Sequence, residues 1–180
     1  THFLSAEVAA HLKKSGKITS TVLTVVTDYM AHHLWVNPGT DYYAVMHKET
    51  RQSVADRGGD SNGIRVTGIP IHEKFLESWD RASVARELGL DPHAKIALVT
   101  SGSFGLGPTE EVIRSLEKFS SEIQMIIVTG HNEVLRKYLE SMKTSIRLKV
   151  LGFVDYMPKL MAISDLVITK AGGATISECL

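Results

Sequence analysis

Short apolar runs alternate with amphipathic segments along the chain, and this alternation restricts the possible fold more than any other feature. In the second part of the chain the runs occupy residues 96–100, 123–129, 146–151 and 166–169. Helix-like segments lie between them, at residues 109–119, 133–142 and 158–163. Strands that are separated by helices form parallel sheets with right-handed crossovers, and their ligands bind where the strands end. The sequence therefore predicts an α/β fold with a site at the carboxyl ends of its strands.

The first part of the chain shows the same alternation. Strands are predicted at residues 21–27, 41–45 and 64–68, and helices at residues 5–14, 47–57 and 81–89. Ser5 is a suitable cap for the first helix. Pro70 cannot continue a regular strand, and periodicity is weak over residues 71–80, so we expect a hinge between two domains there.

The end of the chain carries the strongest candidate site. The strand Leu166–Thr169 is followed by Gly172 and Gly173 and then by a predicted helix. Free backbone N–H groups at such a helix start attract phosphates, and paired glycines let a diphosphate approach closely. Glu178 lies about one turn into the helix, where it could accept hydrogen bonds from two sugar hydroxyls. The spacing Thr175-x-x-Glu178 also fits a capping box, in which Glu178 would only close the helix end.

A second glycine-rich turn follows the strand 96–100. Gly102, Gly105 and Gly107 precede Pro108, a residue that suits the first turn of a helix. The turn lacks both the Walker sequence and the dinucleotide-binding spacing. It is either a cradle for phosphate or sugar, or a structural turn. Gly152 follows a third strand, and all three glycine features fall at the same predicted edge.

Polar and aromatic residues gather after the strand 21–27. Asp28, His32 and His33 lie there with Tyr29 and Trp35. The end of a parallel strand is a common place for binding residues. The alternative is that the aromatic residues pack and the histidines are solvated. His32 and His33 make a poor zinc signal, because adjacent side chains should point apart and no Cys or Glu stands at ligand spacing.

Composition excludes several classes of function. The chain has 20 Lys and Arg against 20 Asp and Glu, so no overall field favours nucleic acid. Its single cysteine, Cys179, is expected to pack in the last helix, and one cysteine fits a reducing, cytoplasmic compartment. No apolar run is long enough to cross a bilayer. The chain lacks an initiator Met and stops inside a predicted helix, so we expect it to be part of a longer protein.

The motifs together resemble one known family. They are Thr27-Asp28-Tyr29 with His32-His33-x-Trp35, Asp41-x-Tyr43, Val66-Thr67-Gly68-Ile69-Pro70-Ile71, Gly102-x-x-Gly105-x-Gly107, Gly152-Phe153-Val154 and Ser164-Asp165-Leu166-x-x-Thr169-Lys170-x-Gly172-Gly173-x-Thr175-x-x-Glu178. This set is similar to the monogalactosyldiacylglycerol synthases and processive diacylglycerol glucosyltransferases. The terminal motif is shared more widely, including with the peptidoglycan N-acetylglucosaminyltransferase.

The resemblance implies a GT-B fold of two Rossmann-like domains. Residues 1–70 would end the acceptor domain, residues 71–80 would form the hinge, and residues 81–180 would make up most of the nucleotide-sugar domain. Glu178 would hold the ribose hydroxyls, while Phe153 and Val154 would lie against uracil. The implied diphosphate and sugar contacts come from Gly102, Ser103, Gly105, Gly107, Lys170, Gly172, Gly173, Ala174 and Thr175.

The resemblance also implies the reaction. A hexose would pass with inversion from UDP-glucose or UDP-galactose to diacylglycerol or another lipid acceptor, without a metal or other cofactor. Asp28, His32 and His33 are catalytic candidates on the acceptor side. The expected location is the cytoplasmic face of the membrane, bound peripherally, and residues 1–180 alone are expected to be inactive. A peptidoglycan-type transferase, a UDP-sugar epimerase of the same fold and a nucleotide-binding regulatory domain remain open as alternatives.

Overall fold

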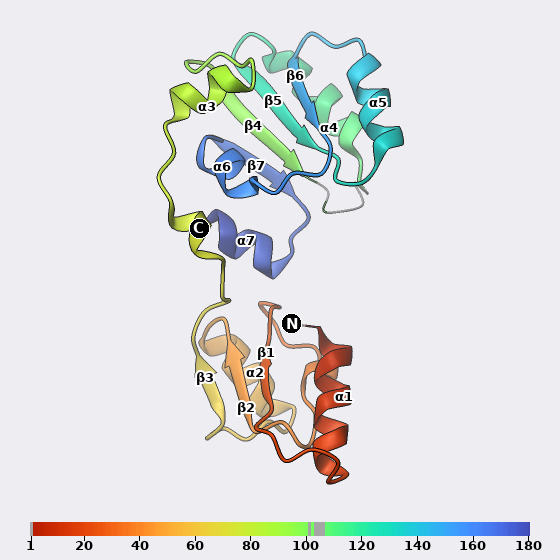
Figure 1. The fold of residues 1–180 in the computed structure, drawn as a ribbon, viewed down its shortest axis with the longest axis vertical. Helices are drawn as coiled ribbons and strands as arrows, with labels where there is room; N and C mark the ends of the chain where they lie inside the picture. The colour runs from red at the N-terminus through yellow and green to blue at the C-terminus, as the bar shows by residue number, and fades with distance from the viewer. Residues whose placement is uncertain (1, 101, 103–106) are drawn as a thin grey trace. The chain divides into compact units, whose positions relative to one another are not determined.

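The chain contains two separate parallel sheets. The computed structural model describes residues 2–100, 102 and 107–180. Contacts among its residues divide it into two compact units: residues up to Ile71 together with 172–178 and 180, and residues 72–171 together with 179. Each unit has a sheet of its own (Figure 1). The predicted α/β class is confirmed, whereas the domain limits 1–70, 71–80 and 81–180 stay a prediction.

The first unit is built on a sheet of three strands. The strands are β1 (Leu23–Val25), β2 (Tyr42–Val45) and β3 (Ile64–Val66), paired in parallel in that order. Helix α1 (Phe3–Lys14) precedes β1, and α2 (Lys48–Asp56) connects β2 to β3. A short 3-10 helix, η1 (His33–Trp35), lies between β1 and β2. The unit's core comprises Val26, Ala31, Trp35, Tyr43, Val45, Val54 and Ile64.

Trp35 anchors this core. Its side chain is 3% exposed, and its ring meets that of Phe3 edge-on with centroids 6.5 Å apart. The indole Nε1–H donates a hydrogen bond of 2.6 Å to the Asp28 carboxylate. A buried polar group needs such a partner, because leaving it unpaired costs its full desolvation penalty. Asp28 therefore ties the end of β1 to the core.

Histidines start the helices and 3-10 helices around this unit and in the segment after it. The Nδ1 atoms of His2, His32 and His47 accept hydrogen bonds from the N–H groups of Leu4, Leu34 and Thr50. His72 does the same for η2 (Glu73–Leu76). The expectation that Ser5 caps α1 is wrong, because the helix begins two residues earlier, at Phe3, with His2 as its cap.

The second unit has four parallel strands in the order β6-β5-β4-β7. These are β4 (Lys95–Thr100), β5 (Ile123–Val128), β6 (Arg147–Leu151) and β7 (Leu166–Thr169). The helices are α3 (Arg81–Glu87), α4 (Thr109–Leu116) with the 3-10 helix η3 (Glu117–Phe119), α5 (Glu133–Ser141) and α6 (Met157–Ala162). Helix α7 (Gly173–Cys179) follows β7 in the sequence, and its residues 173–178 belong to the first unit. The strands and helices agree with the predicted segments, apart from shifts at their ends.

Helices cover both faces of this sheet. Ile96 and Leu98 of β4 pack with residues of α3 and α6, whereas Ala97 and Val99 pack with residues of α4 and α5. Successive side chains of a strand point to opposite faces, so both faces of β4 are buried. This double burial explains why the strands read as continuous apolar runs. In contrast to the packing that we expected for Cys179, its side chain is exposed.

One carboxylate fastens the amino end of this sheet. Asp165 precedes β7 and accepts hydrogen bonds from the Ile96 N–H at 2.9 Å, Lys95 at 2.9 Å and Arg81 at 2.7 Å. Arg81 also donates to the carbonyl oxygens of Ala94 and Ile163. Burial raises the pKa of Asp165, but the donors outweigh it and lower the pKa from 3.8 to about 2. Asp165 thus joins α3, β4 and β7 through its charged form.

The Asp28–Trp35 hydrogen bond can be measured with a double-mutant cycle. Asp28→Ala should lower the free energy of unfolding by about 1–3 kcal/mol, because it leaves a buried N–H unpaired. In a Trp35→Phe background the same substitution should cost less than about 0.5 kcal/mol, since no N–H remains to be satisfied. Urea denaturation of the four proteins checks this. Equal costs in both backgrounds would contradict the assigned role of Asp28.

Asp165→Asn should lower the free energy of unfolding by about 2 kcal/mol at pH 7, as one pKa unit corresponds to about 1.4 kcal/mol. Because the folded state lowers this pKa, the stabilisation is present above about pH 4 and disappears as the pH falls towards 2. Wild type and variant should therefore converge in acid. Glu140→Gln, which breaks an exposed ion pair with Arg136, is the control and should cost less than about 1 kcal/mol. A pH-independent difference would rule out the charged contact.

Candidate functional site

Four strand ends and their turns form one edge of the second unit. Strands β4, β5, β6 and β7 are parallel, so their last residues, Thr100, Val128, Leu151 and Thr169, lie at the same edge. A glycine follows each strand within three residues: Gly102, Gly130, Gly152 and Gly172. Gly102 and Gly130 have φ angles of +76° and +60°, which favour glycine. The predicted meeting of glycine turns at one edge is confirmed for the residues after β4 and β6.

A cavity of about 150 Å³ opens at this edge between β4, β7 and the start of α4. Thr100 and Thr109 line it and are only 7% and 4% exposed. Lys170 also lines the cavity, and its Nζ lies 3.8 Å from the position that a Cβ on Gly102 would take. Two threonines and an ammonium group around one cavity suit an anion such as a phosphate.

The structure brings together three of the residues predicted for the diphosphate and sugar contacts. Gly107 and Lys170 line the cavity, and Gly102 lies against Lys170. Ser103 and Gly105 lie outside the described residues. Thr100 and Thr109 were not predicted from the sequence. A threonine at the end of a buried strand and another directly after Pro108 were the available signals.

The turns after β5 and β6 lie side by side. Thr129 donates from both its N–H and its hydroxyl to the carbonyl oxygen of Leu151, at 2.9 and 3.2 Å. His131 and Phe153 stack above this link, with ring centroids 4.6 Å apart and an angle of 11° between the planes. Phe153 is 61% exposed, whereas Val154 packs against the core. The two residues predicted to lie against uracil therefore differ in exposure, and His131 was missed.

Helix α7 follows the paired glycines, as predicted, but begins at Gly173 with Gly172 as its N-cap. The Ile176 N–H bonds to the Gly172 carbonyl oxygen, so the N–H groups of residues 173–175 precede the first intrahelical bond. Thr175 is inside the helix, and the capping-box alternative for Glu178 is wrong. Glu178 is half-buried, and burial raises the pKa of its carboxyl group.

The acceptor-side candidates have structural partners. Asp28 accepts the Trp35 indole N–H, and His32 caps η1 through Nδ1. His32 and His33 are exposed, and their ring centroids lie 4.1 Å apart, so the expectation that the two side chains point apart is wrong. The catalytic role of Asp28, His32 and His33 stays a prediction. Within the described part of the chain, no group of three metal-binding side chains could hold an ion.

Tyr29 is a further residue of interest in the first unit. Its hydroxyl is buried and has no hydrogen-bond partner among the residues that the structure describes. The ring lies 5.9 Å from that of His47, and the Thr50 hydroxyl donates to the Tyr29 carbonyl oxygen at 2.5 Å. The sequence analysis had singled out Tyr29 only as part of the aromatic cluster.

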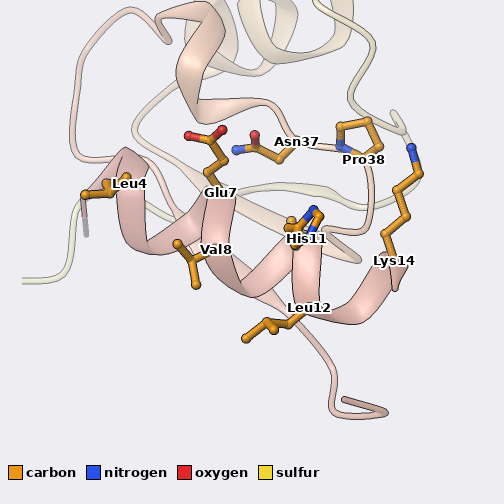
Figure 2. A pocket seen from close by; sticks show the side chains of 9 residues that line it. Leu4, Glu7, Val8, His11, Leu12, Lys14, Asn37 and Pro38 are labelled. Atoms are coloured by element: carbon orange, nitrogen blue, oxygen red, sulfur yellow. The ribbon is translucent and has the colours of Figure 1, made fainter. Parts of the chain in front are cut away.

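A second hollow, of about 430 Å³, runs along α1 in the first unit. Its lining includes Leu4, Val8 and Leu12, which are spaced by four residues on the helix, and Figure 2 shows Glu7 beside Asn37. Leu4 and Val8 are 56% and 52% exposed. We assign this apolar groove no ligand. Among the described residues, no helix is long and apolar enough to span a membrane.

Two family models match the chain. Residues 1–71 match monogalactosyldiacylglycerol synthase, and residues 96–180 match the C-terminal domain of glycosyltransferase family 28. The processive diacylglycerol beta-glucosyltransferase of Staphylococcus epidermidis is 34% identical over 175 residues, which cover 96% of this chain and 45% of that protein. The enzyme of the same name from Bacillus subtilis is 30% identical over 174 residues, with coverages of 95% and 45%.

Solved structures match the fold as well. Anabaena HepE in complex with UDP and glucose has a TM-score of 0.61 at 17% identity, covering 92% of this chain and 50% of that one. Its complex with UDP-glucose gives the same TM-score at 16% identity. The chain spans about half the length of the curated relatives and structures that it matches. The chain is thus similar in sequence to the monogalactosyldiacylglycerol synthases and processive diacylglycerol glucosyltransferases, and it has a GT-B type of fold.

Proposed function

We propose that this chain provides the donor-binding part of a glycosyltransferase that moves a hexose from a UDP-sugar to diacylglycerol. The observation that carries the proposal is the cavity at the carboxyl edge, which Lys170 lines together with the threonines Thr100 and Thr109. Its chemistry suits the phosphates of a nucleotide sugar. Relatives of the chain are named for glucosyl transfer to diacylglycerol, and HepE, which shares its fold, was crystallised with UDP-glucose.

The proposal gives each donor segment a part of the UDP-sugar. The diphosphate is assigned to the turn Gly172–Thr175 and to the region of Lys170, and the base to Phe153 and Val154. Glu178 accepts hydrogen bonds from the ribose hydroxyls. Support comes from the uncapped start of α7 and from the half-buried position of Glu178 after the exclusion of its capping role.

Transfer proceeds with inversion in this proposal. A general base deprotonates the acceptor hydroxyl, which attacks the anomeric carbon as UDP leaves. The leaving diphosphate gains negative charge, and backbone N–H groups and an ammonium group stabilise that charge without a metal ion. Asp28, His32 and His33 are proposed to lie on the acceptor side. We further propose that residues 1–70 belong to the acceptor domain, residues 71–80 to the hinge and residues 81–180 to the donor domain.

The acceptor places the reaction at a membrane surface. Diacylglycerol resides in the bilayer, so the enzyme is proposed to bind peripherally, on the cytoplasmic face where UDP-sugars are available. The names of the relatives favour glucose as the transferred sugar, and galactose is the alternative that the assay must separate.

The complete protein should convert UDP-glucose and diacylglycerol in vesicles to a glycolipid, with release of UDP. Product should depend on diacylglycerol, and mass spectrometry of the lipid extract identifies the sugar. UDP-galactose and UDP-N-acetylglucosamine serve as competing donors. Release of free sugar without an acceptor would indicate an epimerase, and transfer only to a polyprenyl diphosphate saccharide would indicate a peptidoglycan-type enzyme.

Two substitutions should distinguish the residue that binds the ribose from the residue that binds the diphosphate. Glu178→Ala should weaken UDP binding by about 1.5–3 kcal/mol, the scale of hydrogen bonds to a charged group, and leave pyrophosphate binding unchanged. Lys170→Ala should weaken both ligands. Calorimetric titration of the complete protein measures both effects, with the exposed residues Glu140 and Lys143 changed to Ala as controls. If UDP affinity were unchanged in both test variants, the assigned donor contacts would be wrong.

A further inference from the structure

His131 and Phe153 form an exposed aromatic pair at the carboxyl edge of the second unit. Their rings are nearly parallel, 11° apart, at a centroid distance of 4.6 Å. Phe153 keeps 61% of its surface exposed despite this contact, and His131 is exposed as well. The pair therefore adds little to the core. Large exposed aromatic surface at the edge where parallel strands bind ligands points to a ligand with a flat ring.

The backbone under the pair is held from two sides. Thr129, which is 1% exposed, makes two hydrogen bonds to the Leu151 carbonyl oxygen and joins the turns after β5 and β6. Beyond the two rings, Asn132 caps α5 by accepting the Leu135 N–H at 2.9 Å. Val154 packs against the core cluster on the other side. Both rings thus project from anchored turns, which limits the conformational entropy lost when a ligand stacks on them.

Charged side chains of α5 lie beside Gly152 in the turn after β6. A Cβ at this position would lie 3.4 Å from Glu133 Oε1, 3.6 Å from Arg136 Cδ and 3.7 Å from the Gly130 carbonyl oxygen. Glu133 and Arg136 pair with each other at 2.7 Å, so the charged groups beside the turn are mutually compensated. The two aromatic side chains therefore lie beside an ion pair without net charge. Such surroundings suit an uncharged ring of a ligand better than a phosphate.

We infer that His131 is a positioning residue that holds the Phe153 ring as a stacking surface for the pyrimidine base of the donor nucleotide. This inference rests on the proposed function and adds to it a residue from the turn after β5. The imidazole covers one face of the phenyl ring and fixes its orientation, and the base stacks on the surface of the pair that stays exposed. Base stacking on an aromatic side chain tolerates different bases, so the pair contributes affinity more than base selectivity.

The test compares His131→Ala with His131→Phe in the complete protein. His131→Ala should weaken UDP and UMP binding by about tenfold and leave pyrophosphate binding unchanged, because only the base loses its stacking surface. His131→Phe retains a flat ring and should restore affinity to within about twofold of wild type. In the transferase assay, His131→Ala should raise KM for the UDP-sugar by the same factor as the affinity loss and leave kcat unchanged.

His93→Ala is the matched control. His93 is also exposed in this unit, but it lies before β4, at the opposite edge of the sheet, and should leave UDP affinity unchanged. Thermal unfolding of all variants separates loss of binding from loss of structure. If wild type binds UDP and His131→Ala binds it equally well, or if His131→Phe fails to restore binding, the inference is wrong and the proposed function stands. If the wild-type protein does not bind UDP, the inference and the proposed function are both wrong.

Discussion

The parallel pairing of β4 with β5 and β7 is the constraint on which the second unit depends. Parallel strands need crossover connections, and helices α4, α5 and α6 supply these between successive strands. The result is that every strand of the sheet ends at the same edge. Segments far apart in the sequence thereby end at one place, and the turns after β4, β5 and β6 each contain a glycine within two residues of the strand.

The two edges of this sheet have different roles. At the amino edge, Asp165 accepts hydrogen bonds from three donors, and these hydrogen bonds lower the pKa of its carboxyl group. At the carboxyl edge, Thr100, Thr109 and Lys170 line a cavity, and Phe153 is exposed. An exposed aromatic ring adds little to the stability of the fold, and exposed apolar surface is common at binding sites. The amino edge thus stabilises a sheet whose other edge is available for a ligand.

In the first unit, residues that look catalytic by composition also serve the fold. Asp28 satisfies the buried indole of Trp35, and His32 starts the 3-10 helix that carries it. The structure therefore explains part of this cluster of acidic, imidazole and aromatic groups. One member accepts the indole N–H of Trp35, and another caps the first turn of η1. The buried Tyr29 hydroxyl has no such structural explanation among the described residues.

The sequence alone determined the strands, the helices and the parallel pairing, because apolar runs of β-branched residues and glycine turns are local signals. It also predicted Lys170 and Gly102 for the donor site. Tertiary structure decided what local patterns cannot: that Thr100 and Thr109 face one cavity, that His131 stacks on Phe153, and that His2 instead of Ser5 caps α1. These facts depend on strand order and on where each helix begins, since residues distant in sequence meet only after the sheet has paired.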